Sequence, residues 1–220
     1  MDDRPIAVSP RTAEVFASLR RFFSPPPLMV VLSGPAGVGK DSVLRGLRAR
    51  GVPFHFVVTT TDRPIRNGEV DGVDYHFVTT AEFRRLIDTD ALIEWARPYE
   101  QYKGVTKEEV RRAFASGLDA IMRLDVQGAA TIRNKYEQAV TIFLAPPEPE
   151  ALVRRLIGRG DDDPAQIRLR VETSLLEMER AAEFDYLVVN HDDRLVDAVD
   201  QVAAILAAER CRTTRRAVDL

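Results

Sequence analysis

A glycine-rich segment that ends in lysine is the first stretch of this chain with residues suited to chemistry. It reads Gly34-Pro35-Ala36-Gly37-Val38-Gly39-Lys40 and fits the pattern G-x-x-x-x-G-K. Glycines let backbone N–H groups surround phosphate oxygens, a following helix adds its positive end, and the lysine reaches the β- and γ-phosphates of a nucleoside triphosphate. The segment predicts an ATP-binding P-loop in which Lys40 acts on the transferred phosphoryl group.

The two residues after Lys40 depart from that pattern. Asp41 stands where a P-loop carries Ser or Thr to bind Mg²⁺, and Ser42 comes one position later. Two like unit charges ~4 Å apart repel by about 4 kcal/mol at an effective dielectric constant of 20, so a carboxylate near a triphosphate needs a cation between them. Because carboxylate oxygen is a good ligand for Mg²⁺, Asp41 is a candidate metal ligand. The alternative is that Asp41 caps the following helix or pairs with Arg45, which leaves the metal to Ser42 or water.

Two arginines lie three residues apart in a loop rich in turn-forming residues. They are Arg63 and Arg66, and Tyr75 follows nine residues later. Each guanidinium is a planar fork of donors, so two of them can converge on one phosphate dianion, with the Tyr75 hydroxyl as a third donor. Such a pair alone is typical of a solvated surface. Beside a P-loop, it indicates the second phosphate site that a kinase needs for its acceptor.

A third motif follows a predicted core strand and reads Arg123-Leu124-Asp125-Val126-Gln127-Gly128. Ligands of open α/β sheets collect at the carboxyl ends of the strands. Asp125 is therefore a candidate to contact Mg²⁺ or the acceptor, and the alternative is a helix N-cap.

Arginines also surround a turn of glycine and aspartate residues near position 160. Arginines in such a turn can close over the transferring phosphoryl group and exclude water. The alternative is a helix face of mixed charge. The residues concerned are Arg154, Arg155, Arg159, Arg168 and Arg170.

Strands and helices that alternate along the chain would position these residues. Apolar runs without period-2 alternation predict buried strands at 28–32, 120–122, 140–144 and 186–189. Thr106-x-x-Glu109 predicts a capping box and Gly117 the end of that helix; further helices are expected at about 148–157 and from Pro164 to about Ala182. This alternation predicts an α/β fold with a parallel, P-loop NTPase-type sheet flanked by helices. Residues 59–100 break the rhythm and predict an inserted small mixed α/β region.

The overall composition limits the classes of partner. The 220 residues carry 31 Lys and Arg against 34 Asp and Glu, a formal net charge of −3, which is unlike a basic nucleic-acid-binding surface. No window approaches the ~20 apolar residues that cross a bilayer, and the acidic start is unlike a secretory signal. The single cysteine, Cys211, fits a reducing compartment, and the scattered histidines form no zinc motif. We therefore expect a cytoplasmic protein with small-molecule substrates and no nucleic-acid or membrane partner.

Taken together, these motifs resemble the guanylate kinase family over roughly residues 28–210. Four signatures occur in the same order: the P-loop, Thr-x-Arg-x-x-Arg-x-Gly-Glu-x-x-Gly-x-Asp-Tyr, Leu-Asp-Val-Gln-Gly, and Arg-Leu-x-x-Arg-Gly. The resemblance implies a five-stranded parallel core and the reaction of ATP with GMP to give ADP and GDP, with Mg²⁺. It also implies a kinase core at 28–58 and 107–220 with a helical lid at about 155–175, and a GMP-binding region at 59–106. Residues 1–27, which precede this core, are expected to form a polar N-terminal arm that ends in Pro25-Pro26-Pro27. The arm is expected to hold an amphipathic helix at about 11–23, and the alternative is a frayed tail.

The resemblance assigns roles to individual positions of this sequence. Arg63, Arg66 and Tyr75 would bind the phosphate of GMP, and Thr59 and Glu94 would bind the edge of guanine. Asp125 would face GMP and the metal. The remaining roles fall on the lid arginines Arg155, Arg159 and Arg170 and on Asn190 near the adenine of ATP.

Several positions differ from the pattern common in this family. Lys103 and Val105 stand where members commonly carry Tyr and Thr or Ser, so Lys103 is expected to replace one hydroxyl contact with the GMP phosphate by a charge. Arg123 stands where members commonly carry Asp.

Three other functions remain open at this point. The Gly-Lys-Asp-Ser wording of residues 39–42 also resembles ribose 1,5-bisphosphate phosphokinases, which lack the complete GMP block. Guanylate-kinase-like binding modules keep the fold without the chemistry, but the intact Gly39-Lys40 and both arginines argue against that class. A GTPase is disfavoured because Asp125-x-x-Gly128 and Asn134-Lys135 nearly touch in sequence. The sequence does not indicate an oligomeric state.

Overall fold

Five parallel strands form the central sheet in the computed structural model, which describes residues 9–97, 101–157 and 164–220. Their order is β2 (Phe54–Val57), β7 (Asp119–Arg123), β1 (Met29–Ser33), β8 (Val140–Ala145) and β9 (Tyr186–Val189). Four of them match the predicted apolar runs, and a parallel core is confirmed. The strand β2 was not recognised because it is a half-buried edge strand with His55 among its apolar residues.

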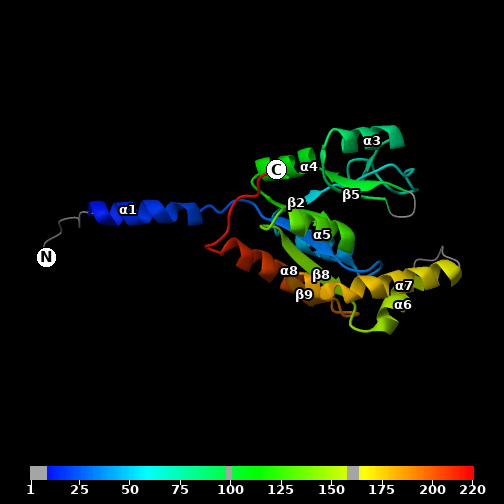
Figure 1. Cartoon of the computed structure of the whole chain (residues 1–220). Coiled ribbons are helices and arrows are strands. Elements are labelled where there is room, and N and C mark those ends of the chain that lie inside the picture. The colour runs from blue at the N-terminus through cyan, green and yellow to red at the C-terminus, as the bar shows by residue number, and fades with distance from the viewer. Residues whose placement is uncertain (1–8, 98–100, 158–163) are drawn as a thin grey trace.

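Helices cover both faces of this sheet (Figure 1). On one face α2 (Lys40–Ala49) packs with α8 (Leu195–Arg210), and on the other lie α4 (Lys107–Ala115) and α5 (Val126–Lys135). In β1, Val30 and Leu32 point to the first face, whereas Met29 and Val31 point to the second. All four are buried. This explains why the sequence of β1 is continuously apolar, as expected for a strand covered on both sides.

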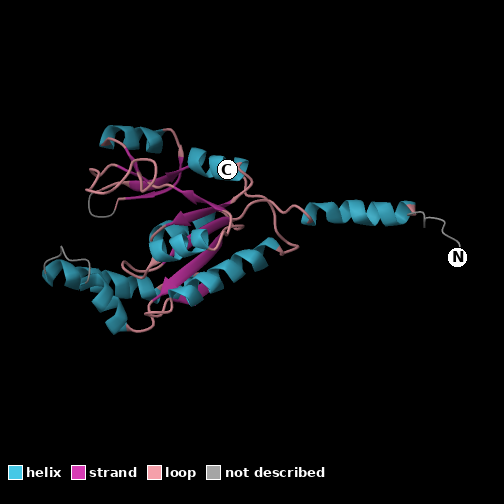
Figure 2. Ribbon diagram, turned by 180° about the vertical axis from the view of Figure 1, so that it is seen from behind, coloured by secondary structure: helices cyan, strands magenta, loops and turns pink. Residues whose placement is uncertain are grey.

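A second, smaller sheet lies beside the first (Figure 2). Its order is β4 (His76–Phe77), β3 (Thr60–Thr61), β6 (Lys103–Thr106) and β5 (Leu92–Ala96), with one parallel and two antiparallel pairings. The helix α3 (Thr80–Asp88) begins at a capping box of Thr79 and Glu82 and buries Phe83 against this sheet. The mixed insertion is thus present, and the domain boundaries at 58/59 and 106/107 remain a prediction.

The start of α4 shows one local difference from the expected capping pattern. The Thr106 hydroxyl accepts the N–H of Glu109, as predicted. The Glu109 carboxylate does not complete the box: it turns inward, where it lies 3.1 Å from Nε2 of His55 on β2. Because α4 packs against β2, the Glu109 carboxylate contacts His55 and does not cap the helix as the local pattern predicted.

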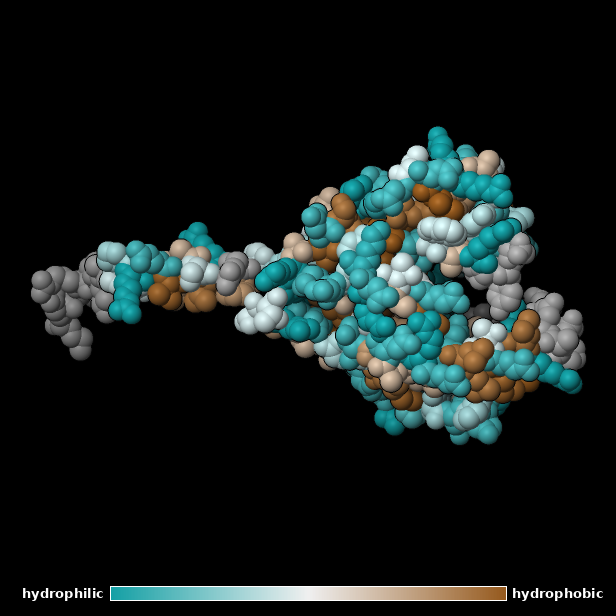
Figure 3. Space-filling view, viewed as in Figure 1, coloured by the Kyte–Doolittle hydropathy of each residue, from teal (hydrophilic) through white to brown (hydrophobic). Residues whose placement is uncertain are grey.

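The remaining helices lie at the two ends of the molecule. The helices α6 (Pro149–Ile157) and α7 (Pro164–Glu179), followed by the 3₁₀ turn η3 (Ala181–Glu183), include the described part of the region predicted to be the lid. At the other end, α1 (Pro10–Leu19) and the 3₁₀ turn η1 (Arg20–Phe22) stand away from the body. The apolar side chains of α1 gather on one side of it (Figure 3). In the part of the chain that the structure describes, no helix has the length and apolar character needed to cross a membrane.

Asp119, at the start of β7, ties three segments together. It is 4% exposed. Its Oδ1 accepts the N–H of Leu28 at 2.8 Å, and its Oδ2 accepts Nε of Arg210 at 2.9 Å. We predict that Asp119→Ala lowers the free energy of unfolding by about 2–4 kcal/mol, because a buried N–H and a partly buried guanidinium lose their acceptor. Urea unfolding of the purified variant measures this.

The matched control is Asp88→Ala at the exposed end of α3. Its effect is expected to stay within about 0.5 kcal/mol. Equal losses for the two variants would show that the buried contacts of Asp119 contribute nothing.

Candidate active site

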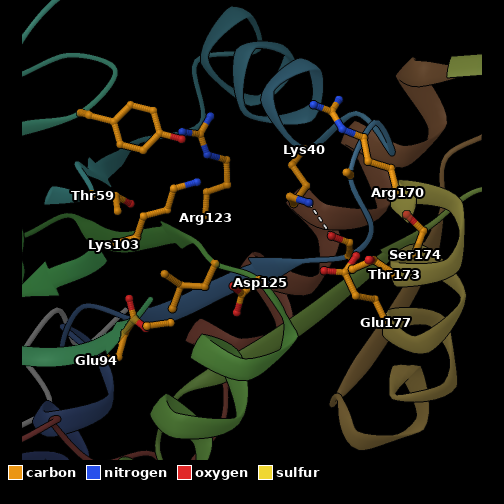
Figure 4. A pocket seen from close by; sticks show the side chains of 15 residues that line it. Lys40, Thr59, Glu94, Lys103, Arg123, Asp125, Arg170, Thr173, Ser174 and Glu177 are labelled. Atoms are coloured by element: carbon orange, nitrogen blue, oxygen red, sulfur yellow. Dashed lines mark hydrogen bonds between the residues drawn. The ribbon is translucent and has the colours of Figure 1, made fainter. Parts of the chain in front are cut away.

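A pocket opens where β1 and β7 end, between the second sheet and α7 (Figure 4). In this view Lys103 and Arg123 lie on one side, Lys40 and Arg170 on the other, and the carboxylates of Glu94, Asp125 and Glu177 below them. This is the edge where parallel sheets bind ligands. The pocket is lined by Gly34, Ala36, Lys40, Thr59, Tyr75, Glu94, Ala96, Lys103, Arg123, Leu124, Asp125, Arg170, Thr173, Ser174 and Glu177.

The P-loop needs glycine at two crowded points. Gly34 has φ +132°, and a Cβ there would lie 2.1 Å from the carbonyl oxygen of Leu144. Gly39 has φ +99°, and its Cβ would lie 2.5 Å from Nδ2 of Asn190. The ammonium group of Lys40 donates to the carbonyl oxygen of Gly34 and, at 3.1 Å, to that of Pro35. Burial lowers the pKa of Lys40 to about 8, and the nearby Glu177 carboxyl opposes that shift. The loop thus holds its lysine in the pocket on two neutral acceptors.

Three carboxyl groups from different elements face the pocket. Glu94 on β5 is 5% exposed, and burial together with the charge of Asp125 raises its pKa to about 8. Asp125 is the N-cap of α5, since its Oδ1 accepts the N–H groups of Gln127 and Gly128 at 3.0 and 2.8 Å. Asp125 therefore caps α5 and also lines the pocket, so the two alternatives drawn from the sequence are both true of its position. Glu177 comes from α7, and burial raises its pKa. Glu177 belongs to no motif by which the sequence analysis could have found it.

Asp41 pairs with Arg123, a partner that the sequence did not suggest. The alternative partner Arg45 instead donates to the Ser42 hydroxyl at 3.1 Å. The Arg123 guanidinium lies 5.6 Å from the ring centre of Phe56 and 5.5 Å from that of Tyr75. Arg123, which the sequence analysis noted only because it differs from the family pattern, is thus part of the pocket wall. The metal role of Asp41 stays a prediction.

The predicted acceptor residues divide into two groups. Thr59, Tyr75 and Lys103 line the pocket together with Glu94 and Asp125. Arg63 lies behind Tyr75, 4.7 Å from its ring centre, and donates to both carboxylate oxygens of Glu69 at 2.5 and 2.7 Å. Arg66 is exposed, and its backbone N–H donates to the same carboxylate at 2.8 Å. In this structure Arg63 and Arg66 therefore stand outside the pocket wall.

A second hollow lies on the far side of the P-loop. It is lined by Gly37, Gly39, Ser42, Arg155, Asn190, His191, Asp192, Asp193 and Leu195. Arg155 donates to the carbonyl oxygen of Asn190 at 2.8 Å and pairs with Asp192 at 2.6 Å. The side chain of Asn190 donates to the carbonyl oxygen of Val38 at 2.8 Å. Of the three predicted lid arginines, Arg155 is thus here, Arg170 lines the main pocket, and Arg159 lies outside the described residues.

Comparisons with known proteins agree on one family. A family model for guanylate kinase matches residues 27–209. The chain is 45% identical over 197 residues to guanylate kinase 2, chloroplastic/mitochondrial, of Oryza sativa subsp. japonica, across 89% of this chain and 69% of the rice protein. It is 42% identical over 181 residues to a guanylate kinase of Gloeobacter violaceus, across 82% of this chain and 87% of that protein. The crystal structure of guanylate kinase from Anaplasma phagocytophilum matches with a TM-score of 0.69 at 28% identity, across 86% of this chain and 89% of that one.

The Arg63–Glu69 pair predicts a pH-dependent contribution to stability. Hydrogen bonds from Arg63 hold the pKa of Glu69 at about 2, below its ordinary value of 4.5. A lowered carboxyl pKa stabilises the fold above pH 4.5, and this contribution is lost as the pH falls through 2. Because Glu69 is partly solvated, we expect Glu69→Gln to lower the free energy of unfolding by about 1–2 kcal/mol at pH 7. Urea unfolding at pH 7 and pH 3 should show a smaller difference at pH 3.

Glu137→Gln in an exposed turn provides the control, with little change expected at either pH. A Glu69→Gln deficit that is the same at both pH values would contradict the ion-pair explanation.

Proposed function

The chain belongs to the guanylate kinase family, and on that premise we propose that it transfers the γ-phosphoryl group of ATP to GMP, giving ADP and GDP. The observation that carries the proposal is the pocket itself. A P-loop lysine stands on one side of it and a buried carboxyl on the other, and cationic side chains stand between. That arrangement fits a donor phosphate chain and an acceptor purine nucleotide side by side in one pocket.

The chemical step needs alignment more than covalent help. An oxygen of the GMP phosphate forms a bond to the γ-phosphorus, and the bond from that phosphorus to the β,γ-bridging oxygen breaks, so that ADP leaves with the electron pair. Lys40 and Arg170 provide positive charge on the P-loop side, and Lys103 does so on the acceptor side. Fixed charges in a site closed to water stabilise the charge that spreads over the transferring group.

Glu94 is the residue suited to recognising guanine. Its carboxylate can accept hydrogen bonds from both N1–H and the 2-amino group of guanine, and adenine presents neither donor at that edge. The buried Thr59 lines the same pocket. Because Glu94 is buried, a base without these two donors would leave its carboxyl without partners, which is a strong basis for discrimination.

The residues present fit a magnesium ion carried with ATP. The described residues hold no group of three or more His, Cys, Asp or Glu side chains that forms a metal cage. Mg²⁺ in kinases is held by one or two carboxylates and by substrate phosphates, and it neutralises charge on the β- and γ-phosphates. Asp125 fits this role, because the hydrogen bonds that cap α5 both engage its Oδ1 and not its Oδ2. The sequence also suggested Asp41 as a metal ligand, but in the structure its carboxylate pairs with Arg123.

The location in the cell is a separate matter. The rice relative is described as chloroplastic/mitochondrial. A cytoplasmic location for this chain therefore remains a prediction from its composition.

A panel of acceptors tests the proposed reaction. With ATP and Mg²⁺, we expect the protein to phosphorylate GMP and to act on AMP, UMP and CMP with kcat/KM lower by about 10²-fold or more. A coupled assay for ADP measures this. Ribose 1,5-bisphosphate belongs in the panel, because preferred phosphorylation of that acceptor would replace the proposed function by the alternative. Nucleotide binding without turnover would indicate a binding module.

The selectivity for guanine is expected to depend on Glu94. In Glu94→Gln the preference for GMP over AMP should fall by about 10²-fold, since an amide cannot accept both hydrogen bonds. The wild-type carboxyl, with its pKa raised to about 8, must lose its proton to accept them. The KM for GMP should therefore fall as the pH rises from 6.5 to 8.5, more steeply in the wild type than in the variant.

The GMP phosphate also titrates in this pH range, but its effect on KM is the same for the wild type and Glu94→Gln. The difference between the two pH profiles therefore reports on Glu94 alone. Glu108→Gln on the exposed side of α4 is the matched control and should keep the wild-type selectivity and pH profile. An unchanged GMP preference in Glu94→Gln would contradict the assignment.

A further inference from the structure

The ion pair of Asp41 and Arg123 joins the helix that follows the P-loop to the wall of the pocket, and the reaction described above makes no use of it. Asp41 is in the first turn of α2, directly after the P-loop lysine. Arg123 is the last residue of β7, 82 positions later in the chain. The pair therefore links the segment that would hold the donor phosphates to the wall of the acceptor side.

Arg123 is held in a fixed place by more than its ion pair. Its side chain is 19% exposed. The guanidinium lies against the rings of Phe56 and Tyr75, from β2 and from the loop before β4. Stacking on aromatic rings and pairing with a carboxylate are the two interactions that best orient a guanidinium. Nη1 is the atom that faces Asp41, and a guanidinium has five N–H donors, so donors remain for a second anion.

Arg123 is one of the few cationic side chains among the described residues on the acceptor side of the pocket. Arg63 stacks on the same Tyr75 ring, but both of its terminal nitrogens donate to Glu69 and it does not line the pocket. Among the described lining residues near Tyr75, the cations are Lys103 and Arg123, with Lys103 5.9 Å from the ring centre. A phosphate dianion that enters beside Tyr75 therefore meets these two side chains first.

The ion pair also explains why both Asp41 and Arg123 differ from the expected residue types. Asp41 stands where a P-loop carries a neutral hydroxyl, and Arg123 stands where the resemblance predicts an aspartate. A serine at position 41 could not neutralise Arg123, and an aspartate at position 123 would repel Asp41. Each departure is costly alone and favourable with the other, because they form one ion pair.

We propose that Arg123 binds the phosphate of the acceptor nucleotide and that Asp41 is a positioning residue for Arg123, not a ligand of Mg²⁺. The inference rests on the proposed function for the identity of the acceptor. In the unliganded protein Asp41 neutralises Arg123 and holds its plane against the two rings. When the acceptor binds, the remaining donors of Arg123 bind its phosphate while Asp41 keeps the guanidinium in place.

Binding of GMP without metal separates this role from metal ligation. We would measure GMP affinity by calorimetry in EDTA without ATP, together with kcat and KM for both nucleotides with Mg²⁺. Arg123→Met should weaken metal-free GMP binding by about 10- to 100-fold and leave ATP affinity within about twofold. Arg123→Lys should recover part of the loss. Asp41→Asn should weaken metal-free GMP binding by about 3- to 10-fold, and it should add no further loss in the Arg123→Met background.

Arg48→Met is the matched control. Arg48 is exposed on α2 and lies 5.8 Å from the ring of the same Phe56, but it does not line the pocket. It should bind GMP as the wild type does. Thermal melting of every variant shows whether it is folded, and if Arg123→Met does not fold, Arg123→Lys and Asp41→Asn decide the outcome.

Two results would overturn the inference. One is wild-type GMP affinity in a folded Arg123→Met or, failing that, in Asp41→Asn. The other is an Asp41→Asn protein with unchanged metal-free GMP binding but a raised Mg²⁺ requirement, which would make Asp41 a metal ligand. Failure of the proposed function looks different, because the wild type itself would then not phosphorylate GMP.

Discussion

The parallel pairing of β1 with β7 is the interaction on which the rest of the site depends. Its register places Leu32 beside Arg123, so that the P-loop and the segment from Arg123 to Asp125 leave the sheet side by side. On its other side β1 pairs with β8, and Gly34 passes so close to the backbone of Leu144 that no side chain fits there. A slip of one residue in either pairing would turn the core side chains of β1 to the wrong face and move Lys40 away from Arg123. The apolar cores on both faces of the sheet fix this register, and the register fixes the pocket.

The charged groups of the site follow a second constraint, which is that a cation withdrawn from water needs an oxygen partner. Lys40 has two backbone carbonyls, Arg63 has Glu69, Arg123 has Asp41, and Arg155 has Asp192 and a carbonyl. Asp41 and Asp192 are partly solvated, and the acceptors of Lys40 are neutral. These partners keep the positive side chains oriented, and phosphate oxygens, which are also charged acceptors, can take their place or join them.

Local patterns in the sequence were enough to predict the helices, the strands and the motifs. They were not enough to predict which side chains pair in the folded protein. Four core strands, the P-loop and the mixed insertion follow from apolar runs, from glycine spacing and from a break in periodicity, all of which act over a few residues. The Arg123 partner lies 82 positions away, and no local rule connects the two. Glu69 is six residues from Arg63, yet its bidentate pairing depends on a loop whose shape the sequence did not define. The prediction that Glu109 completes a capping box was wrong for the same reason, because its carboxylate contacts the half-buried His55 of β2 instead.

Gly128 shows how a single small residue shapes the side of the pocket that is proposed to bind guanine. The start of α5 lies against β5, and a Cβ on Gly128 would be 2.8 Å from Oε2 of Glu94. Glycine at this position therefore lets the Glu94 carboxyl reach the first turn of α5, beside the Asp125 that caps the same helix. That closeness buries Glu94 and sets its charge against that of Asp125, and both effects favour the protonated carboxyl in the empty pocket. If Glu94 binds the base as proposed, a base with two hydrogen-bond donors reverses this balance and a base without them does not. Under that proposal, Gly128 acts on selectivity through the carboxyl that it admits to the pocket.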